Sequence, residues 1–171
     1  MAVANRAEVI YILETLVQEI KNITPASQDW FTEVKNVFLP SFHWSDDVGI
    51  LAQTPRPCVM IWCAGIGQAS KGHTFGERRM FMRTVIVGVT DTPHKNQAQN
   101  AMLSLWDDVH RTITKNQART FPSTPATNEY GVVTADAPGT SSNFEVRQTA
   151  QNRNVGIFVS GYDIEYRSKL Q

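Results

Sequence analysis

A glycine-rich segment between two apolar runs is the part of the chain that most resembles a ligand-binding motif. Gly65, Gly67, Lys71 and Gly72 follow directly on the apolar run 58–64. A phosphate-binding loop needs a glycine, then a lysine, then a serine or threonine that opens a helix whose amides face the phosphate. Here a serine precedes the lysine, and the residues that follow have the pattern of a strand. The segment is therefore predicted to be a mobile hairpin loop that binds no nucleotide.

The acidic residues and histidines lack the spacing that catalysis or metal binding requires. The acidic pairs Asp46–Asp47 and Asp107–Asp108 are sequence neighbours, and neighbours on a helix do not face each other. No serine lies in a nucleophile-elbow pattern. Three histidines lie in separate predicted loops without metal-ligand spacing: His43, His73 and His94. We therefore predict no catalytic residues, no metal site and no cofactor, and we expect that the protein is not an enzyme.

The two cysteines are predicted to be structural thiols. Cys58 and Cys63 lie five residues apart in one predicted strand, so they point to opposite faces and cannot easily form a disulfide. No Cys/His pair elsewhere in the sequence completes a zinc site. Free thiols fit a protein that is made in a reducing cytoplasm.

A local basic patch adjoins the glycine-rich segment. It consists of three arginines: Arg78, Arg79 and Arg83. Two interpretations stay open, a solvated hairpin and a contact site for an acidic partner. The candidate subunit- or partner-contact residues are these arginines together with Gly65, Gly67, Lys71 and Gly72.

Composition limits the class of protein. A chain of 171 residues with 42% hydrophobic residues can bury the core of one domain. Sixteen basic residues balance sixteen acidic ones, which argues against a dedicated nucleic-acid binder and against a polybasic membrane anchor. Zero net charge weakens repulsion between copies and so favours association. We find no apolar run of membrane-spanning length and no signal-peptide pattern, so a cytoplasmic protein is expected.

Hydrophobic periodicity predicts the elements of the first half of the chain. Residues 4–22 have the three- and four-residue apolar spacing of an amphipathic helix. The aromatic, proline-containing segment 30–42 predicts an edge strand or irregular structure. The continuous apolar run 58–64 predicts a strand covered on both faces. It forms a hairpin with the strand 78–90, and residues 65–76 are the predicted long loop between them.

A second amphipathic helix is predicted at 93–115, with Thr92 as its N-cap and Pro93 at its first position. Trp106 lies on its flank. Its apolar stripe consists of Ala98, Met102, Leu105, Val109 and Ile113. Its predicted solvated face carries Asp107, His110 and Arg111.

The last third of the chain predicts a long loop and a closing hairpin. Residues 117–143 are rich in Pro, Thr, Ser and Gly, with one possible strand at 130–134. Strands 143–150 and 155–167 follow, and a change of apolar phase at Ser160–Gly161 predicts a β-bulge. The whole chain is expected to form one α+β domain, with two amphipathic helices packed on one face of a mainly antiparallel, mixed sheet.

The order of these elements resembles the tail terminator (tail completion) proteins of long-tailed bacteriophages. The resemblance covers nearly the whole chain and lies in its layout. It consists of the first helix, the aromatic segment 30–42, a strand introduced by Pro55, Arg56 and Pro57, a long hairpin, the second helix and the closing run VGIFVSGYDIEY at 155–166. The chain is longer than the most compact members of the family, and they lack a proline-rich segment like 117–143.

The resemblance implies a structural virion protein at the neck of the tail, assembled in the host cytoplasm. Its copies would form a hexameric ring that caps the tail tube, stops polymerisation and offers a docking surface to the head–tail connector. The implied partners are further copies of the chain, the tail tube protein, the connector or neck protein and, in a contractile tail, the sheath protein. DNA would pass through the lumen without sequence-specific contacts, and no membrane is involved. Two alternatives stay open: another neck or connector adaptor ring, and a small α+β enzyme or ligand-binding module.

Overall fold

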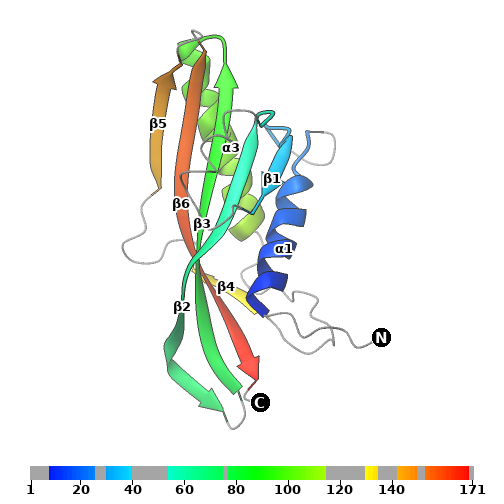
Figure 1. Cartoon of the computed structure of the whole chain (residues 1–171), viewed down its shortest axis with the longest axis vertical. Helices are drawn as coiled ribbons and strands as arrows, with labels where there is room; N and C mark the ends of the chain where they lie inside the picture. Colours follow the sequence, from blue (N-terminus) through cyan, green and yellow to red (C-terminus); the bar gives the residue numbers. More distant parts are fainter. Residues whose placement is uncertain are drawn as a thin grey trace.

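The computed structural model confirms an α+β fold (Figure 1). It describes residues 8–25, 30–39, 54–74, 77–114, 130–134, 142–149 and 153–169. The elements are α1 (Glu8–Lys21), β1 (Asn36–Phe38), β2 (Cys58–Thr74), β3 (Glu77–Thr92), α3 (Lys95–Thr114), β4 (Tyr130–Thr134), β5 (Asn143–Gln148) and β6 (Asn154–Lys169).

The strands form one mixed sheet that is mainly antiparallel, as predicted. Their order is β1-β2-β3-β6-β4, and β5 also pairs with β6. Only the pairing of the short edge strand β1 with β2 is parallel among the described pairs. β5 pairs with β6 at residues 154–159, and β4 pairs with it at residues 163–166. These two short strands therefore flank different stretches of β6.

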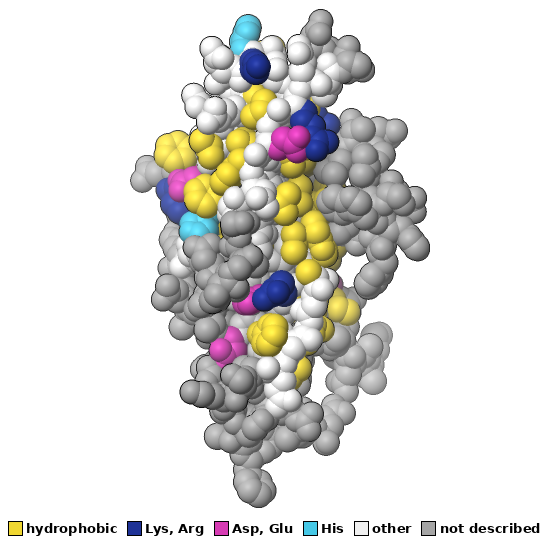
Figure 2. Space-filling model, turned by 90° about the vertical axis from the view of Figure 1, so that its left-hand side faces the viewer, with side chains coloured by type: hydrophobic (Ala, Val, Ile, Leu, Met, Phe, Trp, Pro, Cys, Tyr) yellow, Lys and Arg dark blue, Asp and Glu magenta, His cyan; other side chains and the backbone are white. Residues whose placement is uncertain are grey.

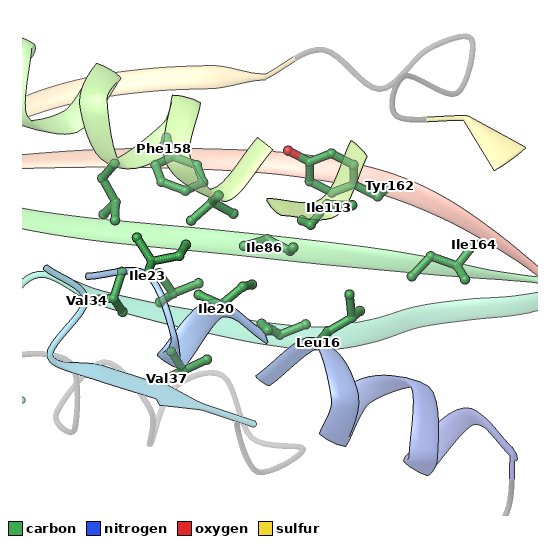
Figure 3. Packing of buried hydrophobic residues seen from close by; sticks show 14 of the residues in the cluster. Leu16, Ile20, Ile23, Val34, Val37, Ile86, Ile113, Phe158, Tyr162 and Ile164 are labelled. Carbon is green, nitrogen blue, oxygen red and sulfur yellow. The ribbon is translucent and has the colours of Figure 1, made fainter. Parts of the chain in front are cut away.

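Both helices contribute to one hydrophobic cluster with the sheet (Figure 3). Ile12, Leu16 and Ile20 of α1 are buried because four-residue spacing places them on one stripe, whereas Ile10 is 41% exposed. The predicted stripe of α3 is buried at every position. The cluster includes Ile12, Leu16 and Ile20 of α1, Met102, Leu105, Val109 and Ile113 of α3, and Val59, Ile61, Ile86, Phe158 and Tyr162 of the sheet.

A second buried cluster lies at the alternate positions of the same strands. It consists of Cys58, Met60, Val87, Val89 and Val155. Successive strand residues point to opposite faces of a sheet, so the start of β2 is buried on both faces. This burial explains the continuous apolar run and confirms the prediction made from it.

The β-bulge predicted at Ser160–Gly161 is wrong. β6 pairs with β3 in unbroken register from Asn154 to Lys169. Apolar residues occupy both odd and even positions at the start of β6 because both faces of the strand are buried there, whereas further along only the even positions are apolar. Ile157 and Val159 pack against the second cluster, whereas Phe158 belongs to the helix-side cluster.

Several predicted boundaries shift by a few residues. His94, rather than Thr92, precedes α3, since its carbonyl accepts the hydrogen bond of the Ala98 amide at 3.2 Å. Thr92 instead ends β3 and donates its hydroxyl to that same carbonyl. Thr149 and Arg153 close the predicted final hairpin through a 2.8 Å backbone hydrogen bond. In the loop predicted at 117–143, the strand at 130–134 is confirmed as β4, and residues 117–129 and 135–141 lie outside the described residues, as do 4–7.

Candidate functional site

The predicted loop at 65–76 is strand over most of its length, which corrects the sequence interpretation. β2 continues to Thr74, and β3 begins at Glu77. Gly67 fits into a strand here because the ring of Phe81 occupies the space into which a side chain at this position would project. The aromatic residue on the paired strand replaces the missing contacts of the glycine.

β2, β3 and β6 continue together beyond the two helices (Figure 1). This extension, here called the arm, comprises residues 65–74, 77–83 and 163–169, and β4 pairs alongside residues 163–166 at its base. It is anchored in the core at its base, where Met82, Ile164 and Tyr166 are buried. The arm is therefore a structured projection of the sheet.

The arm carries all seven of the candidate contact residues. Gly65, Gly67, Lys71 and Gly72 lie on β2, and Arg78, Arg79 and Arg83 lie on β3. The register places Gly65 opposite Arg83 and Gly67 opposite Phe81. Strand pairing therefore brings together residues that sequence analysis grouped only by proximity along the chain. The side chains of Lys71, Arg78 and Arg79 lie outside the described set.

An irregular stretch of β2 retains part of the predicted loop character. The register runs from Gln68 opposite Met80 to His73 opposite Arg78. Residues 69–72 of β2 therefore stand opposite the single residue Arg79 of β3. Unpaired residues of this kind bend a strand and direct side chains out of the ladder. Lys71 and Gly72 belong to this irregular stretch.

Arg83 is engaged within the chain. Its Nε donates a hydrogen bond to Asp163 Oδ1 at 3.0 Å, and its Nη2 donates to Oδ2 at 3.3 Å. These hydrogen bonds, together with the charge of Asp163, raise the pKa of the Arg83 guanidinium. An acidic partner would therefore have to compete with Asp163 for this side chain.

The sheet face opposite the helices combines apolar side chains with ion pairs. Half-buried Phe38, Trp62, Ile157 and Val159 pack around the second cluster. Asp91 pairs with Arg153 at 2.8 Å near one end of β3, and Arg83 pairs with Asp163 further along the strand. The space-filling view shows such an apolar strip between two pairs of opposite charge (Figure 2).

Asp108 on α3, which the sequence analysis considered only as a neighbour of Asp107, is a fully buried carboxylate. Its Oδ2 accepts hydrogen bonds from the backbone amides of Phe31 and Thr32, at 3.0 and 2.8 Å. Its Oδ1 accepts a 2.7 Å hydrogen bond from Arg111, whose guanidinium lies 5.1 Å from the ring centroids of Trp30 and Phe31. This carboxylate joins α3 to a segment 77 residues away, so its role is structural.

The predicted solvated face of α3 is wrong for His110, whereas the side chain of Arg111 is 39% exposed. The His110 ring stacks on Trp106 at 5.1 Å, and its Nδ1 lies 3.3 Å from the hydroxyl of Tyr162. Trp106 Nε1 donates to the hydroxyls of Ser142 and Ser160. These contacts fasten α3 to β6 and to the residue before β5. Asp107 remains partly exposed.

The described residues contain no cluster suited to a metal ion. No three His, Cys, Asp or Glu side chains among them come together as ligands. His94 is exposed, whereas His43 and the side chain of His73 lie outside the described set. The two cysteines are free and belong to opposite faces of β2, as predicted. In the described part of the chain, neither helix is both long and apolar enough to cross a bilayer.

Comparisons with known proteins give no match. The sequence fits no protein-family model, and no curated protein resembles it significantly.

Proposed function

We propose that this chain is a tail terminator, a structural virion protein of a long-tailed bacteriophage. Six copies form a ring that caps the tail tube, stops its polymerisation and provides the docking surface for the head–tail connector. The observed order of elements supports this proposal. A helix, a short edge strand, a long hairpin, a second helix and a closing hairpin follow in the order that suggested the resemblance.

The observation that carries the proposal is the arm. A tube made of identical rings stops growing when its last ring is covered by a protein that binds below and offers no equivalent surface above. Such a protein needs two unlike surfaces on each copy. Here the arm projects beyond the helices at one end of the molecule, and the helix-bearing part forms a different surface (Figure 1).

The helix-bearing surface is mainly polar, with Ile10 and Leu103 also exposed, which suits reversible contact with an assembly partner. Its exposed side chains include Glu14, Gln18 and Lys21 of α1 and Gln99 of α3. The proposed partners are the tube protein, the connector and, in a contractile tail, the sheath protein. DNA crosses the lumen of the ring without sequence-specific contacts. The site of action is the neck of the virion tail.

Assembly with the gene removed tests the proposed function. Tails made without the protein should lose length control and fail to join heads, and added purified protein should restore infectious particles. Tails of normal length that only fail to join heads would favour the adaptor-ring alternative instead. Normal tails that join heads without the protein would contradict both roles.

A further inference from the structure

The outer edge of β5 presents backbone hydrogen-bonding groups that have no partner among the described residues. β5 lies at one margin of the sheet (Figure 1) and, among the described strands, pairs only with β6. The Thr149 amide donates to the Arg153 carbonyl across the hairpin at 2.8 Å, so these two residues form a hydrogen-bonded pair. Such pairs alternate with non-hydrogen-bonded pairs along an antiparallel ladder. The amides and carbonyls of Phe144, Val146 and Gln148 therefore point away from β6 and can pair with a further strand.

The charged residues of β5 do not protect this edge against a second copy. Glu145 and Arg147 lie opposite Ile157 and Val155, on the sheet face away from the helices. Arg147 donates two hydrogen bonds to Glu145, and the two side chains are 65% and 52% exposed. These hydrogen bonds lower the pKa of the Glu145 carboxyl, so both groups are charged at neutral pH. Bulges, prolines and charges commonly protect strand edges, but β5 has an unbroken register, no proline and two charges of opposite sign.

We propose that the β5 edges of two copies pair antiparallel about a twofold axis at Val146, which makes the free protein a dimer. In this register Glu145 of each copy lies directly opposite Arg147 of the other copy. The outward backbone groups of Phe144 then meet those of Gln148, and Val146 meets Val146. Opposite charges at directly opposed positions stabilise an antiparallel pair. The edge is therefore complementary to itself, as a twofold contact requires.

The charges also select this register over its neighbours. The same outward backbone groups could pair after a shift of two residues in either direction. One shift would place Glu145 opposite Glu145 of the other copy, and the other shift would place Arg147 opposite Arg147. Like charges directly opposite each other destabilise strand pairing. Only the register about Val146 brings both side chains opposite an unlike charge.

The helix side of the sheet accommodates the same pairing. Phe144 is 42% exposed, although its ring contacts Trp106 edge-on at 5.5 Å. Pairing about Val146 places Phe144 diagonal to Val146 of the other copy, within reach of an aromatic side chain. Each α3 packs on β3 and β6. The two β6 strands would lie three strand spacings apart, about 14 Å, which exceeds the roughly 10 Å diameter of a helix.

The dimer concerns the free protein and does not rest on the proposed ring. A twofold contact closes after two copies, so it cannot by itself build a ring of six, whose contacts need other surfaces. Zero net charge leaves little repulsion between copies to oppose pairing. Pairing covers an edge that could otherwise join strands of other chains before assembly.

Charge exchange between copies tests both the pairing and its register. Glu145→Lys makes both positions cationic and Arg147→Glu makes both anionic, so each variant alone places like charges opposite each other. Each should dimerise about tenfold more weakly than the unaltered protein, because two attractive contacts become repulsive. A mixture of the two variants has unlike charges at both positions and should form a heterodimer. Analytical ultracentrifugation, with one variant fluorescently labelled, measures each affinity.

The matched controls are Glu33→Lys and Lys35→Glu, which change an exposed ion pair of the same spacing outside β5. They should leave dimerisation unchanged. Gln148→Pro gives a test without a change of charge, since it removes an outward amide and leaves the ladder to β6 intact. It should also weaken the dimer, and it decides the matter if either charge variant loses its circular dichroism signal.

Three results would overturn the inference. The first is an unaltered protein that stays monomeric at its highest soluble concentration. The second is an equal effect of the β5 variants and the controls, which would place the contact elsewhere. The third is a pair of charge variants that dimerise weakly alone and do not recover on mixing. All of these measurements use the free protein, so their failure leaves the proposed ring on the tail tube untouched.

Discussion

Arg83 on β3 and Asp163 on β6 form a two-point ion pair at the base of the arm, directly across from each other in the strand register. Because the pair lies within one chain, we expect it to orient the arm and not to contact a partner. Arg83→Gln, Asp163→Asn and the double substitution should then weaken ring assembly equally, as coupled positions do. Sedimentation of each variant with tail tubes measures the effect. Weaker assembly with Arg83→Gln alone would instead indicate that Arg83 contacts the partner.

The irregular stretch of β2 allows the arm to be altered without loss of the fold. Deleting residues 70–72 leaves one residue of β2 opposite Arg79, so the hairpin can pair in regular register. The core lies outside this stretch, and we expect the urea midpoint to stay close to that of the unaltered protein. Binding to tail tubes should fall if Lys71 and Gly72 make the predicted contacts. A deletion that unfolds the protein would contradict the assignment of this stretch to the projecting arm.

Asp108 and its neighbour Asp107 offer a matched test of the buried carboxylate. Asp108→Ala leaves the amides of Phe31 and Thr32 without their acceptor, which should lower the free energy of unfolding by about 2–3 kcal/mol. Asp107→Ala removes only a partly exposed ion pair with Arg111 and should change the free energy of unfolding by less than about 0.5 kcal/mol. Urea denaturation of both variants measures the difference. Equal effects would show that the buried hydrogen bonds contribute little.

Cys58 should make stability decrease at alkaline pH. Burial raises the pKa of its thiol from 9.0 to about 11, against the smaller opposing effect of Arg56. The unfolded chain therefore releases this proton at lower pH than the folded protein. The contribution is fully present below pH 9 and is lost as the pH rises toward 11, by about 2 kcal/mol at pH 11.

The matched variant for this pH dependence is Cys58→Ala. It should be less stable than the unaltered protein at pH 7, because it leaves a cavity in the second cluster. Its stability should nevertheless fall less steeply between pH 9 and pH 11. Urea unfolding across this range measures both slopes. Parallel slopes would rule out Cys58 as the source of the pH dependence.

Local sequence patterns predicted those parts of the fold that local physics controls. The apolar stripe of α3 and the two-sided burial of β2 follow from spacing alone, since periods of 3.6 and 2 decide which residues share a face. The α+β class and the closing hairpin were predicted for the same reason. The candidate contact residues were correctly placed on one hairpin, although the strands extend much further than glycine content suggested.

Contacts between distant segments could not be predicted in this way. Asp108 lies 77 residues from Phe31 and 76 from Thr32 along the chain, and no spacing rule connects them. The contact of His110 with the hydroxyl of Tyr162 depends on how α3 lies against β6. The strand at Gly67 depends on the Phe81 ring of the paired strand, which a local glycine rule does not consider. The mistaken bulge in β6 arose because an apolar phase change was assigned to the backbone instead of to two buried faces.

Tube elongation in the presence of the purified protein tests the central claim most directly. Tail tube protein is polymerised with increasing amounts of this chain, which carries a gold label, and tube length and label position are measured by electron microscopy. The account predicts that tubes become shorter as the amount of the chain rises, with label at one end only. Labels along the tube wall or at both ends, or tubes of unchanged length, would contradict it.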